Sequence, residues 1–108
     1  MATIEPGGAA DVELQIDQVR RRDDAAATAV VRCVRGPVRL GARFRRIQGV
    51  EAPVDLELTR ILVLGRPVDV LDSGRTALVT LQGTGTYRLR TGDPTLGWQI
   101  VQGGDPSS

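Results

Sequence analysis

The sequence predicts an all-β fold, a small closed antiparallel barrel of about six to eight short strands. Apolar residues alternate with polar ones along several segments, which is typical of strands that bury one side and expose the other. Turns that contain Gly or Pro interrupt the chain at short intervals, as they do in small barrels and sandwiches. A helix at 51–64 is the alternative for one segment, but Pro53 and the alternation after it argue against a helix.

The clearest strand patterns lie at 11–17 and 54–59, where every second residue is apolar. The segment 61–64 is apolar throughout, which indicates a strand that is buried on both sides or crosses a barrel corner. Further strands are expected at 29–34, 38–40, 44–46, 68–70, 77–81 and 98–101. Turns are expected at 22–24, 36–37, 65–67, 72–74, 83–85 and 92–94.

The length of 108 residues suits one domain with one hydrophobic core. We expect residues 1–10 to form a flexible leader, residues 11–102 the single barrel domain, and residues 103–108 a flexible tail. The sequence starts with no pattern of a signal peptide, and no stretch approaches the ~20 apolar residues of a membrane span. A cytoplasmic location without a membrane partner is therefore the expectation.

The composition excludes several kinds of chemistry. The chain has no His and no Lys, so all fourteen cationic side chains are Arg, and the formal net charge is +1. A Ser-His or Cys-His nucleophile pair needs an imidazole base, and a phosphate-binding P-loop needs a Lys. The single Cys33 excludes an internal disulfide framework. We expect no cofactor, no metal, no bound nucleotide and no enzymatic activity.

Three residue patterns have both a chemical and a structural interpretation. Arginines flank Cys33, and nearby cations lower a thiol pKa, yet a small residue packed in a strand is the favoured interpretation. Asp55 and Glu57 share a strand face about 7 Å apart, a spacing that suits paired catalytic carboxylates, but a solvent-facing strand side is favoured. The Gly-rich stretch 83–86 is interpreted as a hairpin turn.

The segment 32–46 is strongly basic and contains no acidic residue. Its cationic residues are Arg32, Arg35, Arg39, Arg43, Arg45 and Arg46. Arg39, Arg43 and Arg45 are expected on one outer surface, because they alternate with apolar residues that point inward. Guanidinium groups bind phosphates and carboxylates with two hydrogen bonds at once, so this surface, with Arg35 and Arg46, is the candidate binding surface. The alternative is charge balance with the acidic strands at 11–24 and 51–57, and no aromatic residue among these arginines offers a base-stacking platform.

Five motifs, in this order, resemble the second domain of translational GTPases such as elongation factor Tu. The matching stretches are Leu14–Val19, Ala29–Gly36, Val38–Gly41, Val79–Gly83 and Leu89–Asp93. They are similar to the family's L-x-I-x-x-V strand, T-V-V-x-G-x-V strand, R-G-x-V-x-x-G turn, V-x-L-x-G strand and later G-D turn. The resemblance spans roughly 12–96 and implies a barrel that contacts tRNA, ribosomal RNA or a translation GTPase.

The chain departs from the family in two places. Ala25–Thr28 stands where the family usually has a G-x-G-T turn, and Val31 stands where its second strand has Gly. The sequence also contains no GTP-binding domain. We therefore expect a non-catalytic binding module of the domain 2 type, with RNA or a translation factor as partner. The alternative is a protein–protein interaction module that has kept the barrel and does not bind RNA.

Overall fold

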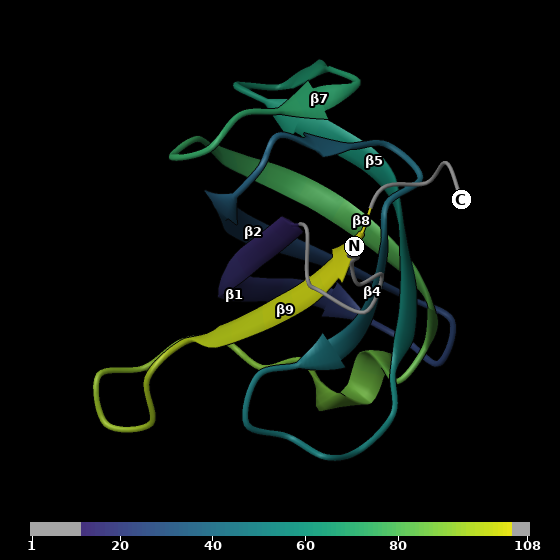
Figure 1. Cartoon of the computed structure of the whole chain (residues 1–108), viewed down its shortest axis with the longest axis vertical. Coiled ribbons are helices and arrows are strands. Elements are labelled where there is room, and N and C mark those ends of the chain that lie inside the picture. The colour runs from purple at the N-terminus through teal and green to yellow at the C-terminus, as the bar shows by residue number, and fades with distance from the viewer. Residues whose placement is uncertain (1–11, 105–108) are drawn as a thin grey trace, which may run out of the picture.

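The computed structural model describes residues 12–104, so the expected leader at 1–10 and the end of the expected tail lie outside the described residues. The all-β expectation is confirmed (Figure 1). The elements are β1 (Val12–Arg22), β2 (Ala26–Arg35), β3 (Val38–Arg39), β4 (Arg43–Ile47), β5 (Asp55–Val63), β6 (Arg66–Pro67), β7 (Val70–Leu71), β8 (Thr76–Thr84), the 3-10 turn η1 (Thr86–Arg88) and β9 (Gln99–Gly104).

Six antiparallel strands form a closed barrel, as the sequence predicts. Their order is β4-β9-β1-β2-β8-β5, and pairing of β4 with β5 closes the ring. Figure 1 shows β9 in front with β1 and β4 on either side. The strand β6 adds to β5 outside the ring, and β3 pairs with β7 in a separate two-stranded sheet.

The period-two pattern of the sequence fills the barrel with aliphatic side chains. Leu14, Ile16, Val31, Leu56 and Leu58 are fully buried, and the residues between them on each strand face outward. Phe44 is also fully buried, whereas the other two aromatic residues of the chain, Tyr87 and Trp98, are exposed. A buried core of this kind supplies most of the free energy of folding.

Two boundaries differ from the sequence-based expectation. The turn expected at 83–85 begins two residues later, at Gly85, because β8 continues to Thr84 before η1 begins. The buried Thr86 then ties η1 to the β1–β2 turn, since its hydroxyl donates a hydrogen bond to the backbone oxygen of Asp23. At the other end β9 begins one residue after Trp98 and runs to Gly104, two residues past the expected domain boundary at 102.

On both sides of the closing β4–β5 pair, the backbones of neighbouring strands approach one another tightly. Gly103 of β9 lies opposite Phe44 of β4, and a Cβ atom at this glycine would lie 1.9 Å from the carbonyl oxygen of Arg43. Gly83 of β8 lies opposite Leu56 and leaves equally little room beside the carbonyl oxygen of Asp55. Glycine is thus required at these two positions by the space between strands.

Candidate binding surface

The outward side of β4 and of the first half of β5 holds the core of the predicted basic surface; we call it the closing wall. The inward position of Phe44 sends Arg43 and Arg45 outward on either side of it. A β-bulge between Phe44 and Arg46 then exposes both Arg45 and Arg46 before Ile47 returns to the core. Across the strand pair, Arg43 lies directly opposite Glu57.

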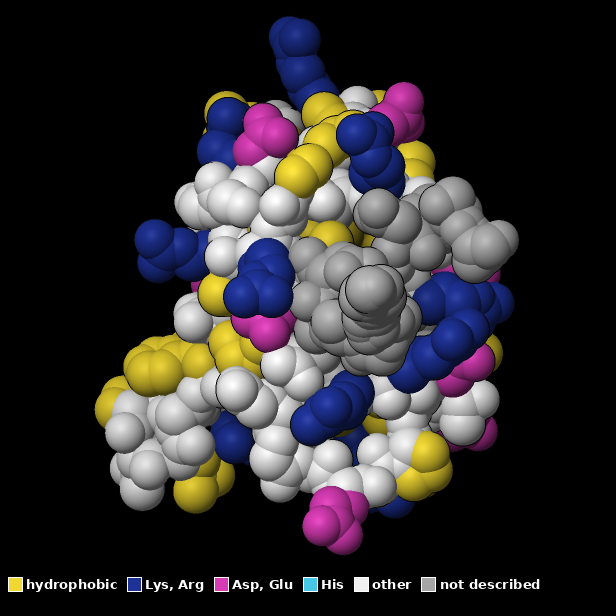
Figure 2. Space-filling view, in the orientation of Figure 1, with side chains coloured by type: hydrophobic (Ala, Val, Ile, Leu, Met, Phe, Trp, Pro, Cys, Tyr) yellow, Lys and Arg dark blue, Asp and Glu magenta, His cyan; other side chains and the backbone are white. Residues whose placement is uncertain are grey.

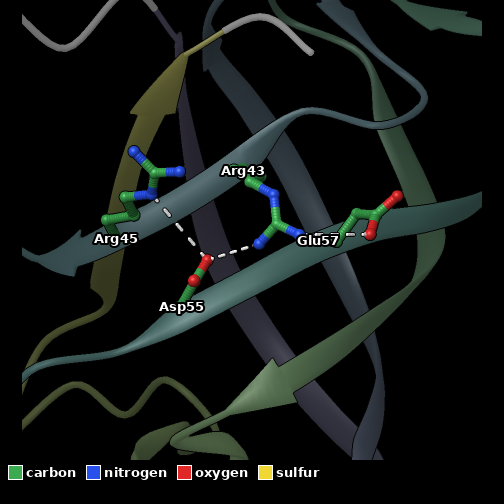
Figure 3. A network of polar contacts seen from close by, with 4 residues as sticks. All are labelled: Arg43, Arg45, Asp55 and Glu57. Atoms are coloured by element: carbon green, nitrogen blue, oxygen red, sulfur yellow. Dashed lines mark hydrogen bonds and ion pairs between the residues drawn. The ribbon is translucent and has the colours of Figure 1, made fainter.

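The closing wall carries a network of opposite charges, not a set of unpaired arginines (Figure 3). The guanidinium of Arg43 lies 2.8 Å from the Asp55 carboxylate, to which it donates a hydrogen bond, and 3.7 Å from the Glu57 carboxylate. The Nε atom of Arg45 lies 3.8 Å from the same oxygen of Asp55. Asp55 is therefore shared by the two arginines.

Two positive and two negative side chains cancel within this network, so with the exposed Arg46 the closing wall offers a net charge of only +1 to a polyanion. Three of the four side chains are 44–48% exposed and Arg45 is 70% exposed. Water screens ion pairs at such exposure, and each contributes only about 0–1 kcal/mol to stability. The main effect of the network is to hold Arg43 and Asp55 in a fixed relative geometry at the surface.

Of the other predicted members of the basic surface, Arg46 lies on β4 beyond the bulge, whereas Arg39 and Arg35 lie on β3 and β2. Arg39 is exposed on β3, in the two-stranded sheet with β7. Arg46 lies opposite Gln102 of β9, and Arg35 lies at the end of β2 opposite Glu13. The structure thus brings Arg43 and Arg45 together around one carboxylate and places Arg35 and Arg39 on strands outside the β4–β5 pair.

In the turn between β1 and β2, Asp23 holds the backbone just before the alanines that stand in place of the family's glycines. The Asp23 carboxylate accepts hydrogen bonds from the backbone N–H groups of Ala25 and Ala26, at 2.8 and 2.9 Å. These two bonds, first that of Ala25, lower the pKa of Asp23, and the charge of Arg21 acts in the same direction. The second departure, Val31, is fully buried and fills the core.

Beside this turn lies a shallow depression of about 430 Å³, lined by Arg21, Arg22, Asp23, Ala26 and Thr28. Arg22 is occupied within the chain, since its guanidinium donates hydrogen bonds to the carbonyl oxygens of Tyr87 and Leu89. The depression is open, its lining is polar and apolar in similar parts, and no cluster of catalytic groups lines it. It has none of the apolar enclosure that is typical of small-molecule sites.

Cys33 is a buried core residue, and its thiol lies beside the Gly36 backbone. Burial raises the pKa of the Cys33 thiol, and the negative charge of Asp72 raises it further, although a hydrogen bond with Ser73 opposes them. The flanking arginines therefore do not produce the reactive thiolate considered from the sequence. Within residues 12–104, no group of three or more Cys, Asp or Glu side chains is arranged to hold a metal ion.

The described part of the chain contains no helix long and apolar enough to cross a membrane. No protein-family model matches the sequence, and no curated protein matches it either. The fold is that of the second-domain barrel of translation factors. It is similar to the apo crystal structure of translation elongation factor SelB from Methanococcus maripaludis, with a TM-score of 0.66 over 84% of this chain at 13% sequence identity. The matched part is 18% of the SelB chain, and the likeness concerns the fold alone.

Two surface features are absent from the sequence-based prediction. Hydrophobic side chains gather over the loop that precedes β9, at the lower left of Figure 2, where Leu96 and Trp98 are exposed. The second feature is the spread of the arginines. In this view they do not form one continuous patch but lie apart, several of them beside acidic side chains. The exposure of Trp98 had no signal in the sequence, because Trp98, Ile100 and Val101 together indicate a strand that begins at Trp98.

Proposed function

We propose that the chain is a non-catalytic binding module of the translation-factor domain 2 type, and that its partner on the closing wall is a protein and not RNA. The observation that supports this choice is the sharing of Asp55 by Arg43 and Arg45. Of the two partners that the family resemblance implies, RNA and a translation GTPase, the second fits such a surface better. A cytoplasmic location is part of the same proposal.

RNA binding depends on cations that neutralise phosphates and release condensed counterions. On the closing wall a phosphate that approached Arg43 would also meet the carboxylates of Asp55 and Glu57. The net charge of +1 adds little long-range attraction. A protein surface with its own mixed charges can instead place an acid against the exposed Arg45 and a base against Asp55, which favours one orientation and one partner.

The RNA part of the proposal is tested on the purified full chain. Its absorbance ratio at 260 and 280 nm is measured before and after nuclease treatment, at about 0.15 M salt. With one Trp and one Tyr the protein absorbs weakly, so even a small amount of bound RNA raises the ratio visibly. We expect no nuclease-sensitive absorbance. RNA that is retained by the wild type and lost from the Arg43→Gln/Arg45→Gln variant would contradict the proposal.

The protein part is tested by comparing cross-linked partners of the wild type with those of the Arg43→Gln/Arg45→Gln variant. The matched control is Arg88→Gln, which removes an exposed arginine that lies over the Tyr87 ring on η1. We expect a specific partner to be captured by the wild type and the control and lost from the double variant. Equal capture by all three chains would exclude the closing wall as the interface.

A further inference from the structure

The outward side of β2, β8 and the second half of β5, together with β6, is a second surface, which we call the long wall. Strand register aligns Val30, Leu78, Leu62 and Pro67 side by side across β2, β8, β5 and β6. Val30, Leu78 and Leu62 face outward, because their neighbours along each strand pack into the core, and Pro67 is exposed on β6. These four residues form an apolar row that runs across the strands.

Arginines lie on both sides of the apolar row. Arg32 follows Val30 by two residues on β2 and lies opposite Thr76, whereas Arg60 precedes Leu62 by two residues on β5 and lies opposite Thr80. Each arginine is therefore about 7 Å from the row, on opposite sides of it. Neither forms an ion pair within residues 12–104, and no carboxylate occupies the rungs of β2, β8 and β5 that hold these residues.

The β5–β6 turn adds an exposed leucine beside the end of the row. Leu64 has a left-handed backbone conformation, with φ of 52°, and its side chain is 95% exposed. This conformation costs a leucine about 1 kcal/mol or more, and packing within the chain does not compensate for it. Strained and exposed residues of this kind cluster at binding sites.

We propose that the long wall binds an acidic amphipathic helix of a protein partner. Strands lie about 4.8 Å apart, so the four residues of the row span about 14 Å. A helix rises 5.4 Å per turn, so about three turns laid along the row would place one apolar side chain over each of its positions. Carboxylates on both flanks of that apolar stripe would then meet Arg32 and Arg60, which have no acidic partner of their own in the described chain.

Aliphatic side chains do not provide the stacking surface that single-stranded RNA uses, and no aromatic residue lies on the strands of the long wall. A protein helix is therefore the occupant that the composition of this surface favours. The inference goes beyond the proposed function, because it concerns other residues on another side of the barrel.

The probe is a fluorescein-labelled synthetic helix of about 15 residues, or four turns. Its Leu residues are spaced to form one stripe, Glu residues flank the stripe on both sides, and Ala fills the rest. Binding to the full chain is measured by fluorescence anisotropy at two salt concentrations. We expect saturable binding that weakens with salt, and no binding of a matched peptide with Lys in place of every Glu.

Variants locate the binding. Arg32→Glu/Arg60→Glu should weaken binding of the acidic peptide by about tenfold or more, because like charges then face each other. Leu64→Ser should weaken it about fivefold without loss of folding, since this side chain is almost fully exposed. Arg88→Glu makes the same charge change on η1 and should leave the affinity unchanged. Arg43→Gln/Arg45→Gln should also leave it unchanged, which separates this inference from the proposed function.

Three results would overturn the inference. In the first, the acidic peptide fails to saturate or binds no better than its Lys counterpart. In the second, Arg88→Glu and Arg32→Glu/Arg60→Glu weaken its binding equally. In the third, a single-stranded RNA of about 15 nucleotides displaces the peptide and loses its own binding in Arg32→Glu/Arg60→Glu, which would make the long wall a nucleic-acid surface.

Discussion

The closing wall and the long wall use the same cation in opposite ways. On the closing wall Arg43 and Arg45 surround Asp55 and their charges are balanced within the chain. On the long wall Arg32 and Arg60 flank an apolar row and form no ion pair with the described residues. The difference arises from register, because each strand pairing decides which outward side chains meet. A count of arginines along the sequence therefore does not locate a binding surface, whereas the cross-strand neighbours of each arginine do.

On the closing wall, β4 also lies very close to β9, and a substitution at this contact should have the largest effect on stability. Gly103→Ala would place a Cβ atom 1.9 Å from the Arg43 carbonyl oxygen, where only backbone could move away. We expect a loss of about 3 kcal/mol or more in the free energy of unfolding, measured by urea denaturation and circular dichroism.

The control for this prediction is Gly49→Ala in the β4–β5 connection. A Cβ atom there meets nothing within 4 Å, but φ is +78°, so the backbone strain costs only about 1 kcal/mol. If the two variants unfold at the same urea concentration, β9 does not approach β4 as closely as the structure places it, and the β4–β9 pairing of the barrel would be in doubt.

Much of the barrel is predictable from local sequence patterns, and the closure and the surfaces are not. The alternation at 11–17 and 54–59 predicts β1 and β5 because burial of one strand side is a local, period-two property. The outward direction of Arg43 and Arg45 follows likewise from the inward Phe44. Their shared contact with Asp55 depends on the β4–β5 register, which is not a local property of the sequence. The sequence alone therefore left two interpretations of these arginines open, a binding surface and charge balance. The apolar row takes one residue from each of four strands, so no sequence window contains it.

Removal of the acids on the closing wall should make it behave as a basic surface. Asp55→Asn/Glu57→Gln leaves Arg43 and Arg45 without their carboxylate partners. We expect the affinity for a labelled single-stranded RNA to rise about fivefold at low salt, equivalent to roughly 1 kcal/mol, and to fall again steeply with salt. The melting temperature should change by only a few degrees, because exposed ion pairs contribute little to stability.

The control for this gain is Asp69→Asn, which removes one exposed negative charge from the segment between β6 and β7. A rise in RNA affinity of the same size per charge removed would show that net charge alone decides RNA binding. The local pairing of Arg43 and Arg45 would then not be the feature that separates the two walls.

The smallest expected effect concerns the β1–β2 turn, at the end of the long wall. The Asp23 carboxylate accepts the N–H groups of Ala25 and Ala26, and its pKa lies below the ordinary value of 3.8. Its ionised form is thus the one that the folded state favours. The stabilisation is complete above pH 3.8 and disappears as the pH falls through the lowered pKa of the folded protein. Asp23→Asn keeps an oxygen acceptor but cannot ionise, so its melting temperature should lie slightly below that of the wild type at neutral pH and converge with it in acid.

Asp24→Asn removes the same charge from the next residue and controls for net charge. If the difference between the wild type and Asp23→Asn stays constant down to strongly acidic pH, the hydrogen bonds to ionised Asp23 do not stabilise this turn, and residues 23–26 are held by the strand pairing alone.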